Sequence, residues 1–420
     1  MNRTELPDPL DLFPPTRDAA LRRLADFVPR AGRDYARTRN ADPGPGLKSN
    51  VSMLSPYIRY RVITEREVVA AVLERYAPSR AEKFIQEVLW RTYWKGWLQM
   101  RPQVWRDFRA ERDGDRAAVA DNAGLQRALA EAEEGRTGIA CFDDWARELV
   151  ATGYLHNHAR MWFASIWIFT LKLPWALGAD FFLRYLLDGD PASNTLGWRW
   201  VAGIQTRGKT YRARPGNIAK YTDGRYSADE LGRKLATEAP PIRDEAPPKP
   251  HDVPAADEPP GDEPAVLLLH GDDLSGFEAL PHRARIEAVT VTGAGHIDAP
   301  WPFGDKAGAF VAGAADDAAE RAARALDVEA EVVRGIDAGA LIERARAAGV
   351  ELVLTPEAPV GPVADGLDAI EPALNRAGLR LRRVRRDWDD AAWPYATKGF
   401  FPFKKKIPLL LARAGLVPGD

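Results

Sequence analysis

The stretch that decides the fold runs from Gly153 to Trp200 and reads GYLHNHARMWFASIWIFTLKLPWALGADFFLRYLLDGDPASNTLGWRW. Its first part, read as a helix, puts Asn157, Arg160 and Met161 on one face. An amide, a guanidinium and a thioether together are a poor set for a buried core face. Two carboxylates, an amide and two indoles follow, at Asp188, Asp190, Asn194, Trp198 and Trp200. This combination favours a binding site for a large planar ligand with polar edges.

Residues 1–235 carry apolar side chains at helical spacing almost throughout. The spacing predicts helices over Ala19–Phe27, Glu65–Arg75, Arg80–Gln99, Ala117–Glu134, Phe142–Ala151, Leu155–Leu171 and Ala179–Leu187. Ten of the thirteen tryptophans precede residue 201. We therefore expect residues 1–235 to form a mainly α-helical domain.

Residues 236–264 have a different composition, with nine prolines, eight acidic residues and almost no large apolar side chains. Such a segment cannot bury enough apolar surface to fold by itself. Its proline content favours an extended, rather stiff chain. We interpret it as a linker between two domains.

Residues 265–420 alternate short apolar runs with alanine-rich helical stretches. The predicted strands are Ala265–Leu269, Ile286–Val291, Glu329–Val333, Glu351–Leu354 and Leu379–Val384, and the helices are Asp305–Leu326, Asp337–Ala348 and Gly366–Ala377. Alternation of this kind is typical of a doubly wound parallel α/β (Rossmann-like) domain. The predicted fold class is therefore an all-α domain followed by an α/β domain.

The composition is that of a water-soluble protein, with 45% hydrophobic and 28% charged residues. The single cysteine, Cys141, excludes an intrachain disulfide and a four-cysteine iron–sulfur cluster. We found no apolar leader and no apolar stretch long enough to span a bilayer, so we expect a cytoplasmic protein without membrane contact.

Charge is shared unevenly between the two halves. Residues 1–235 contain 37 Lys and Arg against 29 Asp and Glu, whereas the rest of the chain contains 21 against 31. A basic module joined to an acidic one suggests a polyanionic partner for the first half.

Glu87, Trp90, Arg91 and Trp94 form a second polar and aromatic helix face, at spacing i, i+3, i+4 and i+7. They fit an amphipathic helix whose tryptophans pack inward while Glu87 and Arg91 pair at the surface. They equally fit a helix that lines a cavity together with the Asn157 face. The residues alone leave both interpretations open.

Ser52 and Ser55 precede a predicted helix, where hydroxyl and backbone N–H groups can bind a phosphate or simply cap the helix. Asp190 followed by Pro191 fits a helix N-cap and first position. We expect no metal site. The Asp188–Asp190 loop has Ser193 where a calcium loop needs glycine, and His156 and His158 point to different sides of a helix.

Taken together, these stretches resemble the DNA photolyase/cryptochrome family over roughly residues 15–225. The matching motifs are Leu-Ser-Pro-Tyr with its preceding serine (Ser52–Tyr57), Glu-x-x-Trp-Arg (Glu87–Arg91), Gly-Tyr-Leu-His-Asn-x-x-Arg-Met (Gly153–Met161) and Asp-Gly-Asp…Asn…Gly-Trp-x-Trp (Asp188–Trp200). Tyr35 resembles the tyrosine that closes over the flavin.

The resemblance implies that FAD is the cofactor. Asn194 would lie opposite flavin N5, Arg160 would pair with Asp188 beside the isoalloxazine, and Asp190 would accept from its N3–H. Ser52, Leu54 and Ser55 would hold the pyrophosphate. The implied cofactor-binding set is Tyr35, Ser52, Met53, Leu54, Ser55, Arg91, Asn157, Arg160, Asp188, Asp190 and Asn194.

The resemblance also implies a pocket for a lesion of ultraviolet-damaged DNA. Glu87 would hydrogen-bond the lesion, Trp90 and Trp200 would flank it, and Met161 with Asn157 would complete the pocket. Trp198 and Trp175 match the two inner members of an electron-transfer chain. The implied activity is light-dependent splitting of cyclobutane pyrimidine dimers by a deoxyribodipyrimidine photo-lyase.

Three positions depart from the family pattern. The third tryptophan of the electron-transfer chain has no counterpart near Asn122, His158 replaces an arginine, and Val51 replaces a threonine. The missing tryptophan, His158 and the acidic second half favour a cryptochrome-like blue-light photoreceptor as the alternative function, with a protein partner that the sequence does not identify. A light-independent FAD protein is a third interpretation.

The order of the halves is the largest departure, because in the family the α/β antenna domain comes first. Val266–Leu274 resembles the first strand of that domain, and Tyr395–Lys406 resembles the segment that closes it. We therefore expect a circular permutation, with domains at 1–235 and 265–420 joined by the linker at 236–264. An unrelated flavodoxin-like module is the alternative, and a second, antenna chromophore is not identified by the sequence.

Overall fold

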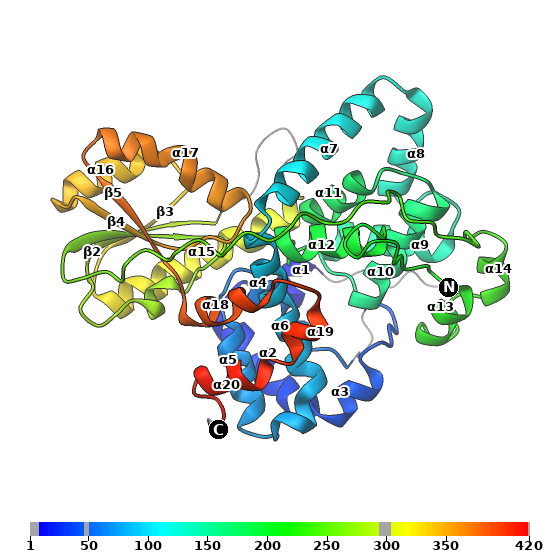
Figure 1. Cartoon of the computed structure of the whole chain (residues 1–420), viewed down its shortest axis with the longest axis horizontal. Helices are drawn as coiled ribbons and strands as arrows, with labels where there is room; N and C mark the ends of the chain where they lie inside the picture. The colour runs from blue at the N-terminus through cyan, green and yellow to red at the C-terminus, as the bar shows by residue number, and fades with distance from the viewer. Residues whose placement is uncertain (1–7, 46–49, 294–303, 419–420) are drawn as a thin grey trace.

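The computed structural model describes residues 8–45, 50–293 and 304–418. Figure 1 shows an assembly of helices beside a sheet that is covered by further helices. This arrangement confirms the predicted fold class of a helical part and a parallel α/β part.

The helical half is built around α6 (Pro78–Gln99), which is 22 residues long. The other helices are α1 (Pro9–Leu12), α2 (Arg17–Phe27), α3 (Arg33–Thr38), α4 (Ser55–Arg59), α5 (Glu65–Leu73), α7 (Pro102–Ala120), α8 (Ala123–Glu133), α9 (Ala140–Thr152), α10 (Asn157–Ser165), α11 (Trp175–Tyr185), α12 (Pro191–Val201), α13 (Pro215–Tyr221) and α14 (Ala228–Gly232). A short π-helical turn, Ile166–Thr170, extends α10. Helices α3, α5, α7 and α12 pack on α6.

One helix differs from its prediction. The apolar spacing predicted a single helix over Ala117–Glu134, but α7 ends at Ala120 and α8 begins at Ala123. The side chain of Asn122 accepts hydrogen bonds from the backbone N–H groups of Gly124 and Leu125, at 3.0 Å each. An N-cap residue has a non-helical backbone, so this cap interrupts the helix that the pattern suggested.

Gly153 brings the two ends of the deciding stretch together. Its φ of 63° lies in the left-handed region, and a Cβ there would come within 2.6 Å of Leu187. The Leu187 N–H donates to the Gly153 carbonyl at 2.8 Å. The start of α10 and the Asp188–Asp190 segment therefore lie side by side, although 35 residues separate Gly153 from Asp188 in the sequence.

The second half contains a five-stranded parallel sheet of order β3-β2-β1-β4-β5. Its strands are β1 (Pro264–His270), β2 (Arg285–Thr292), β3 (Ala330–Val333), β4 (Leu352–Pro356) and β5 (Arg380–Val384). The helices are α15 (Asp305–Leu326), α16 (Ala338–Ala348) and α17 (Pro362–Arg376). Alternate side chains of β1 face opposite sides: Leu267 and Leu269 belong to the core that includes α15, whereas Val266 and Leu268 belong to the core under α16 and α17.

The chain between the halves has no regular helix or strand from residue 233 to residue 263. It lies against the helical half, where the His251 N–H donates to the Met100 carbonyl at 2.9 Å and Arg101 Nε donates to the Pro248 carbonyl at 2.8 Å. The segment is therefore laid along the surface at the junction of α6 and α7.

After β5 the chain returns to the helical half. Helices α18 (Asp387–Ala392), α19 (Phe400–Lys404) and α20 (Ile407–Arg413) follow, and α18 and α19 pack on α6 (Figure 1). Trp388 Nε1 donates to Thr92 Oγ1 at 3.0 Å. A Cβ at Gly96 would come within 2.8 Å of the Trp393 backbone, so the glycine allows this close approach.

Two buried arginines join the halves, and we call them and their carboxylate partners the arginine seam. Arg59 is hydrogen-bonded to Asp272, which follows β1, and its Nε donates to the Gly189 carbonyl at 2.9 Å. Arg61 binds both oxygens of Asp389, at 2.8 and 2.6 Å, and lies 3.4 Å from Asp273. The side chains of both arginines are 1% exposed.

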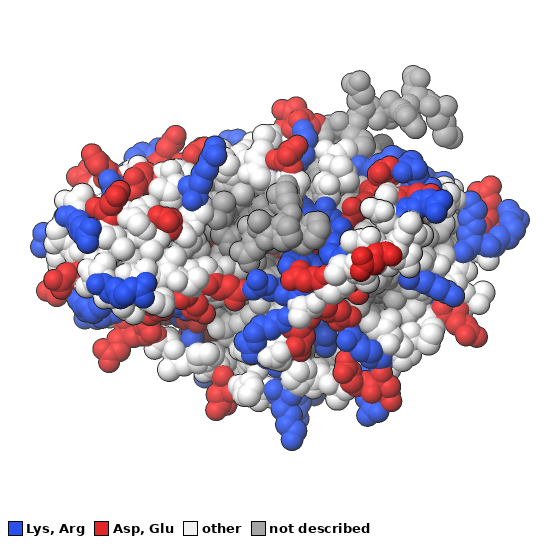
Figure 2. All heavy atoms as spheres, turned by 90° about the horizontal axis from the view of Figure 1, so that it is seen from above, with Lys and Arg blue, Asp and Glu red and all other residues white. Residues whose placement is uncertain are grey.

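Figure 2 shows that acidic and basic side chains are interspersed over the face seen from above. That face carries no broad patch of a single sign. Among the helices in the described part of the chain, none is long and apolar enough to cross a membrane.

Replacing Arg61 by methionine tests the arginine seam. The substitution leaves the carboxylates of Asp273, Asp389 and Glu65 buried beside an uncharged side chain. We expect the free energy of unfolding to fall by about 3–5 kcal/mol, as when one partner of a buried ion pair is removed. Urea unfolding followed by circular dichroism measures the change.

The matched control is Arg37→Met, which breaks the exposed ion pair between Arg37 and Asp34. That change should cost no more than about 1 kcal/mol. Equal stabilities of the Arg61 and Arg37 variants would contradict the importance of the seam.

Candidate functional site

Asp190 lies at the centre of the candidate site. It caps α12, where its Oδ1 accepts from the Ser193 N–H at 2.7 Å. Its Oδ2 lies 3.4 Å from Arg91 Nη1, 3.9 Å from Arg59 Nε and 4.0 Å from Lys95 Nζ. Burial by itself would raise the pKa of this carboxyl, but the three cations outweigh burial and hold it well below its usual range. Asp190 is therefore a fixed anion.

Polar atoms without hydrogen bonds surround this carboxylate. Within the described ranges, Arg91 Nη1, Lys95 Nζ and Ser193 Oγ are buried and make none. Buried polar groups in proteins are nearly always satisfied, so such a cluster indicates a site that a polar ligand completes. Asp190 as an acceptor with unused donors beside it fits the polar edge of a flavin ring.

Arg160 and Asp188 form a two-pronged ion pair beside this cluster. Arg160 Nη1 and Nη2 donate to the two oxygens of Asp188 at 2.9 and 3.0 Å, and Nε donates to the Leu155 carbonyl at 2.8 Å. Burial would raise the pKa of Asp188, but Arg160 lowers it, with help from Arg91 and a hydrogen bond from Ser55. These three hydrogen bonds fix the plane of the Arg160 guanidinium beside the start of α12.

Asn194 lies one turn into α12. Its Nδ2 donates to the Ala179 carbonyl of α11 at 2.8 Å, which fixes the plane of the amide. Because the two polar atoms of a carboxamide lie on opposite sides, the oxygen faces away from Ala179. The sequence pattern could not supply this partner, because α11 and α12 meet only in the fold.

The Ser52–Ser55 loop leads into α4. Met53 has a left-handed backbone with φ of 52°, and Ser52 Oγ accepts from the Leu54 N–H at 3.4 Å. The start of α4 has no side-chain cap. The Ser55 hydroxyl reaches Asp188, so this loop joins the Arg160–Asp188 pair.

Tyr35 of α3 packs on α6. It makes an edge-to-face contact with Phe84 at 5.3 Å and another with Phe27 at 5.8 Å. Burial raises the pKa of its hydroxyl, which therefore stays protonated.

The residues expected to hold a lesion come from three neighbouring helices. Glu87 and Trp90 belong to α6, Asn157 and Met161 to α10, and Trp200 to α12. Helix α12 packs on both α6 and α10. Asn157 is exposed as the first residue of α10, and Met161 lies about one turn further along.

Glu87 pairs with Arg39, whose Nε lies 3.4 Å from Glu87 Oε1. Burial raises the pKa of the Glu87 carboxyl, and Arg39 opposes that shift. About a third of the side chain stays exposed, at 36%. The carboxyl is therefore available to a ligand.

Trp90 stacks on Phe400 of α19, with ring centres 3.7 Å apart and planes 12° apart. Trp200 stacks on Tyr211 at 5.4 Å. Both tryptophans are only partly buried. One face of each indole is therefore covered by a stacked neighbouring ring.

The two expected electron-transfer tryptophans are buried and have different ring neighbours. Trp198 meets Trp167 edge-on at 6.1 Å, whereas Trp175 packs on Phe108 at 5.6 Å and donates to Glu111 at 2.8 Å. A Cβ at Gly178 of α11 would come within 2.3 Å of the Trp198 ring.

Sequence reasoning missed several side chains of the site. Arg59, Lys95, Ser193, Arg39 and Phe400 all contact predicted residues. Lys95 had a local signal, because it lies four residues after Arg91 on the same helix face. Phe400 had none, since it reaches Trp90 from 310 residues further along the chain.

In the described part of the chain, the histidine, cysteine and acidic residues form no group that could hold a metal ion.

Comparisons with known proteins find relatives of the helical half. Residues 84–227 match the family model described as the FAD binding domain of DNA photolyase. A deoxyribodipyrimidine photo-lyase of Thermus thermophilus is 37% identical over 199 residues, which are 46% of this chain and 44% of that protein. The Streptomyces griseus photo-lyase is 34% identical over 156 residues, 37% of this chain and 32% of that one. This chain thus spans less than half the length of these relatives.

Among solved structures, the class III photolyase of Agrobacterium tumefaciens is 26% identical, with a TM-score of 0.43, and the match covers 53% of this chain and 46% of that one. The sequence matches fall on the helices that carry Glu87, Arg160, Asp190 and Asn194. By these sequence matches, the helical half of this chain is similar to the FAD binding domain of DNA photolyases.

Proposed function

We propose that this protein repairs DNA by splitting cyclobutane pyrimidine dimers in a light-dependent reaction. The observation that carries the proposal is the placement of two sites along one helix. On α6, Arg91 and Lys95 face the buried Asp190, while Glu87, one turn before Arg91, and Trp90, directly before it, lie partly exposed. A cofactor at the first site and a flipped dimer at the second would therefore be neighbours.

In this proposal, residues of five segments would hold FAD. Asp190 accepts from the flavin edge, Arg160 lies beside the ring in its pair with Asp188, and Asn194 offers its amide oxygen. Ser52, Met53, Leu54 and Ser55 hold the pyrophosphate, and Tyr35, Arg91 and Asn157 complete the site. The unused donors of Arg91, Lys95 and Ser193 support this assignment.

When bound, FAD would supply the light-driven electron transfer that splits the dimer with no net redox change. The protein residues bind, orient and exclude water. Asp190 and Asp188 stay ionised because their pKa values are lowered, and Tyr35 stays protonated. The two carboxylates beside the proposed cofactor site therefore keep their negative charge at neutral pH.

The dimer would enter the pocket by flipping out of the helix, which costs less for a damaged and poorly stacked base. Trp90 and Trp200 offer flat aromatic faces, and stacking on such faces contributes about 1–3 kcal/mol per base. Glu87 provides a carboxyl of raised pKa for a hydrogen bond to the pyrimidine edge. Trp198 and Trp175 would carry electrons to the cofactor.

We further propose that the chain is a circular permutant of the family, with domains at residues 1–235 and 265–420 and a linker at 236–264. The five-stranded parallel sheet, and the return of α18 and α19 to α6, support this order. A covalent connection between the halves is tolerated at different places when chain ends lie at domain surfaces.

The direct test is blue-light turnover of a single-stranded oligonucleotide with one cyclobutane thymine dimer, using reduced, FAD-loaded protein. We expect the dimer to split in light and to persist in darkness, and a (6-4) photoproduct to stay intact. A photoreducible FAD with no dimer splitting would overturn repair and favour the photoreceptor alternative.

Replacing Glu87 by alanine should weaken dimer binding while FAD stays bound. Loss of a hydrogen bond that involves a charged group costs about 1.5–3 kcal/mol, which corresponds to a tenfold to hundredfold loss of affinity. Fluorescence anisotropy of the dimer oligonucleotide measures it. Glu82→Ala on the same helix, which breaks the pair with Lys404 and the hydrogen bond from Gln86, is the matched control and should bind as the unchanged protein does.

Replacing Phe400 by alanine should also weaken dimer binding, because Trp90 loses the ring that holds it flat. An aromatic pair contributes about 0.5–1.5 kcal/mol beyond its buried area, so we expect a loss of at least about threefold. Phe401→Ala, which truncates the 79% exposed neighbour, is the control. Tryptophan fluorescence should report greater mobility in the Phe400 variant, and identical spectra and affinities in both variants would contradict the assignment.

A further inference from the structure

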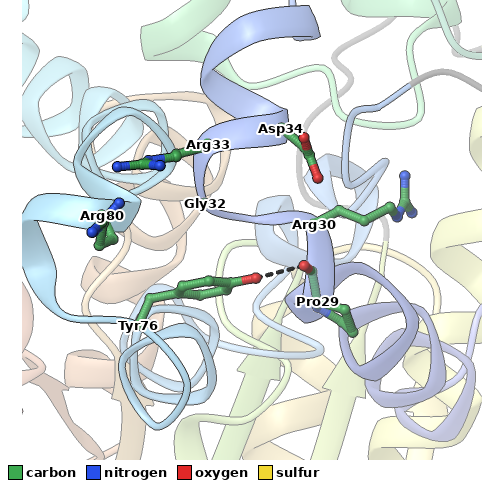
Figure 3. Close-up of a pocket in the computed structure, with 7 residues that line it drawn as sticks. All are labelled: Pro29, Arg30, Gly32, Arg33, Asp34, Tyr76 and Arg80. Carbon is green, nitrogen blue, oxygen red and sulfur yellow. Dashed lines mark hydrogen bonds between the residues drawn. The ribbon is translucent and has the colours of Figure 1, made fainter.

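An open pocket lies at the start of α6, away from the proposed cofactor site. It has a volume of about 260 Å³ and lies between the turn before α3 and the first residues of α6. Figure 3 shows Arg30, Arg33 and Arg80 around it, with Tyr76 below and Asp34 at one side. The Tyr76 hydroxyl donates to the Pro29 carbonyl at 2.5 Å, which fixes one wall.

The charged groups of this pocket are mostly available to a ligand. In the residues that the structure describes, neither Arg33 nor Arg80 has a hydrogen-bond or ion-pair partner, and both side chains are exposed. Arg30 is oriented by Asn50 at 3.0 Å and by the ring of Phe27. The carboxylate of Asp34 forms an ion pair with Arg37, in which Oδ1 lies 3.3 Å from Nη2.

Three guanidinium groups around one small pocket favour a phosphate. Each guanidinium presents planar N–H donors that match phosphate oxygens, and the charges add. The backbone around Gly32 approaches closely: a Cβ at this residue would come within 3.1 Å of the Tyr76 ring. The contacts of Tyr76 with Pro29 and Gly32 therefore form one wall of the pocket and leave the side that carries the arginines open.

The pocket lies on the same face of α6 as the proposed lesion site. Arg80 and Glu87 are seven residues apart, which places them on one side of the helix about 10 Å apart along its axis. Between them, Phe84 packs against Tyr35, so α3 runs beside this face. Arg39 of the same segment then reaches Glu87.

We infer that this pocket binds a backbone phosphate of the strand that carries the dimer. The inference rests on the proposed function and adds a second point of attachment to it. The phosphate would belong to a nucleotide that flanks the dimer, and a phosphate contact carries no sequence preference.

The test compares oligonucleotides with different flanks around one thymine dimer. One is the dimer dinucleotide alone, which has no flanking phosphate, and the other has six nucleotides on each side of the dimer. The variant is Arg33→Ala with Arg80→Ala. The control is Arg346→Ala with Arg376→Ala, which removes the same charge from exposed helix ends of the α/β half.

We expect the Arg33/Arg80 variant to bind the long oligonucleotide about tenfold more weakly and the short one unchanged, in darkness and at fixed salt. The slope of log affinity against log salt should fall by about 0.7 for each lost phosphate contact to a single strand. The control should match the unchanged protein on both oligonucleotides. FAD content and melting temperature confirm that both variants fold.

Other results overturn the inference in distinguishable ways. Equal binding of the long oligonucleotide by variant and control would show that the pocket does not hold DNA phosphate. Calorimetric binding of inorganic phosphate that the variant loses, with no dependence on flank length, would make the pocket a site for free phosphate instead. Failure of the unchanged protein to prefer dimer-containing over undamaged DNA would contradict the proposed function itself.

Discussion

The arrangement of the whole molecule depends on the burial of Arg59 and Arg61. A buried guanidinium is costly unless carboxylates and carbonyls surround it. Here the carboxylates come from opposite parts of the chain: Asp272 and Asp273 follow β1, Asp389 lies in α18, and Asp190 caps α12. The two halves must therefore meet for either arginine to be satisfied.

This constraint reaches the proposed cofactor site because Asp190 is shared. Arg59 lies between Asp190 and Asp272, so one side chain contacts the carboxylate assigned to the flavin and the first loop of the sheet. Displacement of the α/β half would remove a partner of Arg59 and alter the charge around Asp190. The second half thus supports the site electrostatically as well as through the stacking of Phe400 on Trp90.

Helical spacing predicted two shared helix faces, Asn157–Arg160–Met161 and Glu87–Trp90–Arg91–Trp94, and the family resemblance implied the remaining site positions. Arg160 and Asp188 do pair as the family resemblance implies, and Arg91 lies beside Asp190. The alternation of short apolar runs with alanine-rich helical stretches predicted the parallel sheet. Strands that are buried on both faces appear in a sequence as continuous apolar runs. Asp190 followed by Pro191 correctly indicated the start of α12.

The remaining features are tertiary and leave no local pattern. Asn122 belongs to a run with helical spacing, yet its side chain caps a new helix. Arg61 pairs with Asp389 at a separation of 328 residues. No sequence pattern near either residue predicts this pair. The pocket lined by Arg30, Arg33 and Arg80 also combines the starts of α3 and α6, which only the fold brings together.

The central claim is that the buried arginine seam, rather than the covalent linker, joins the halves into one site. A protease site inserted between Ala255 and Ala256 would test it in the FAD-loaded protein. The account predicts that the cleaved chain elutes as one species in size-exclusion chromatography and keeps its FAD and its affinity for dimer-containing DNA. Separation of the two fragments, with release of FAD, would contradict it.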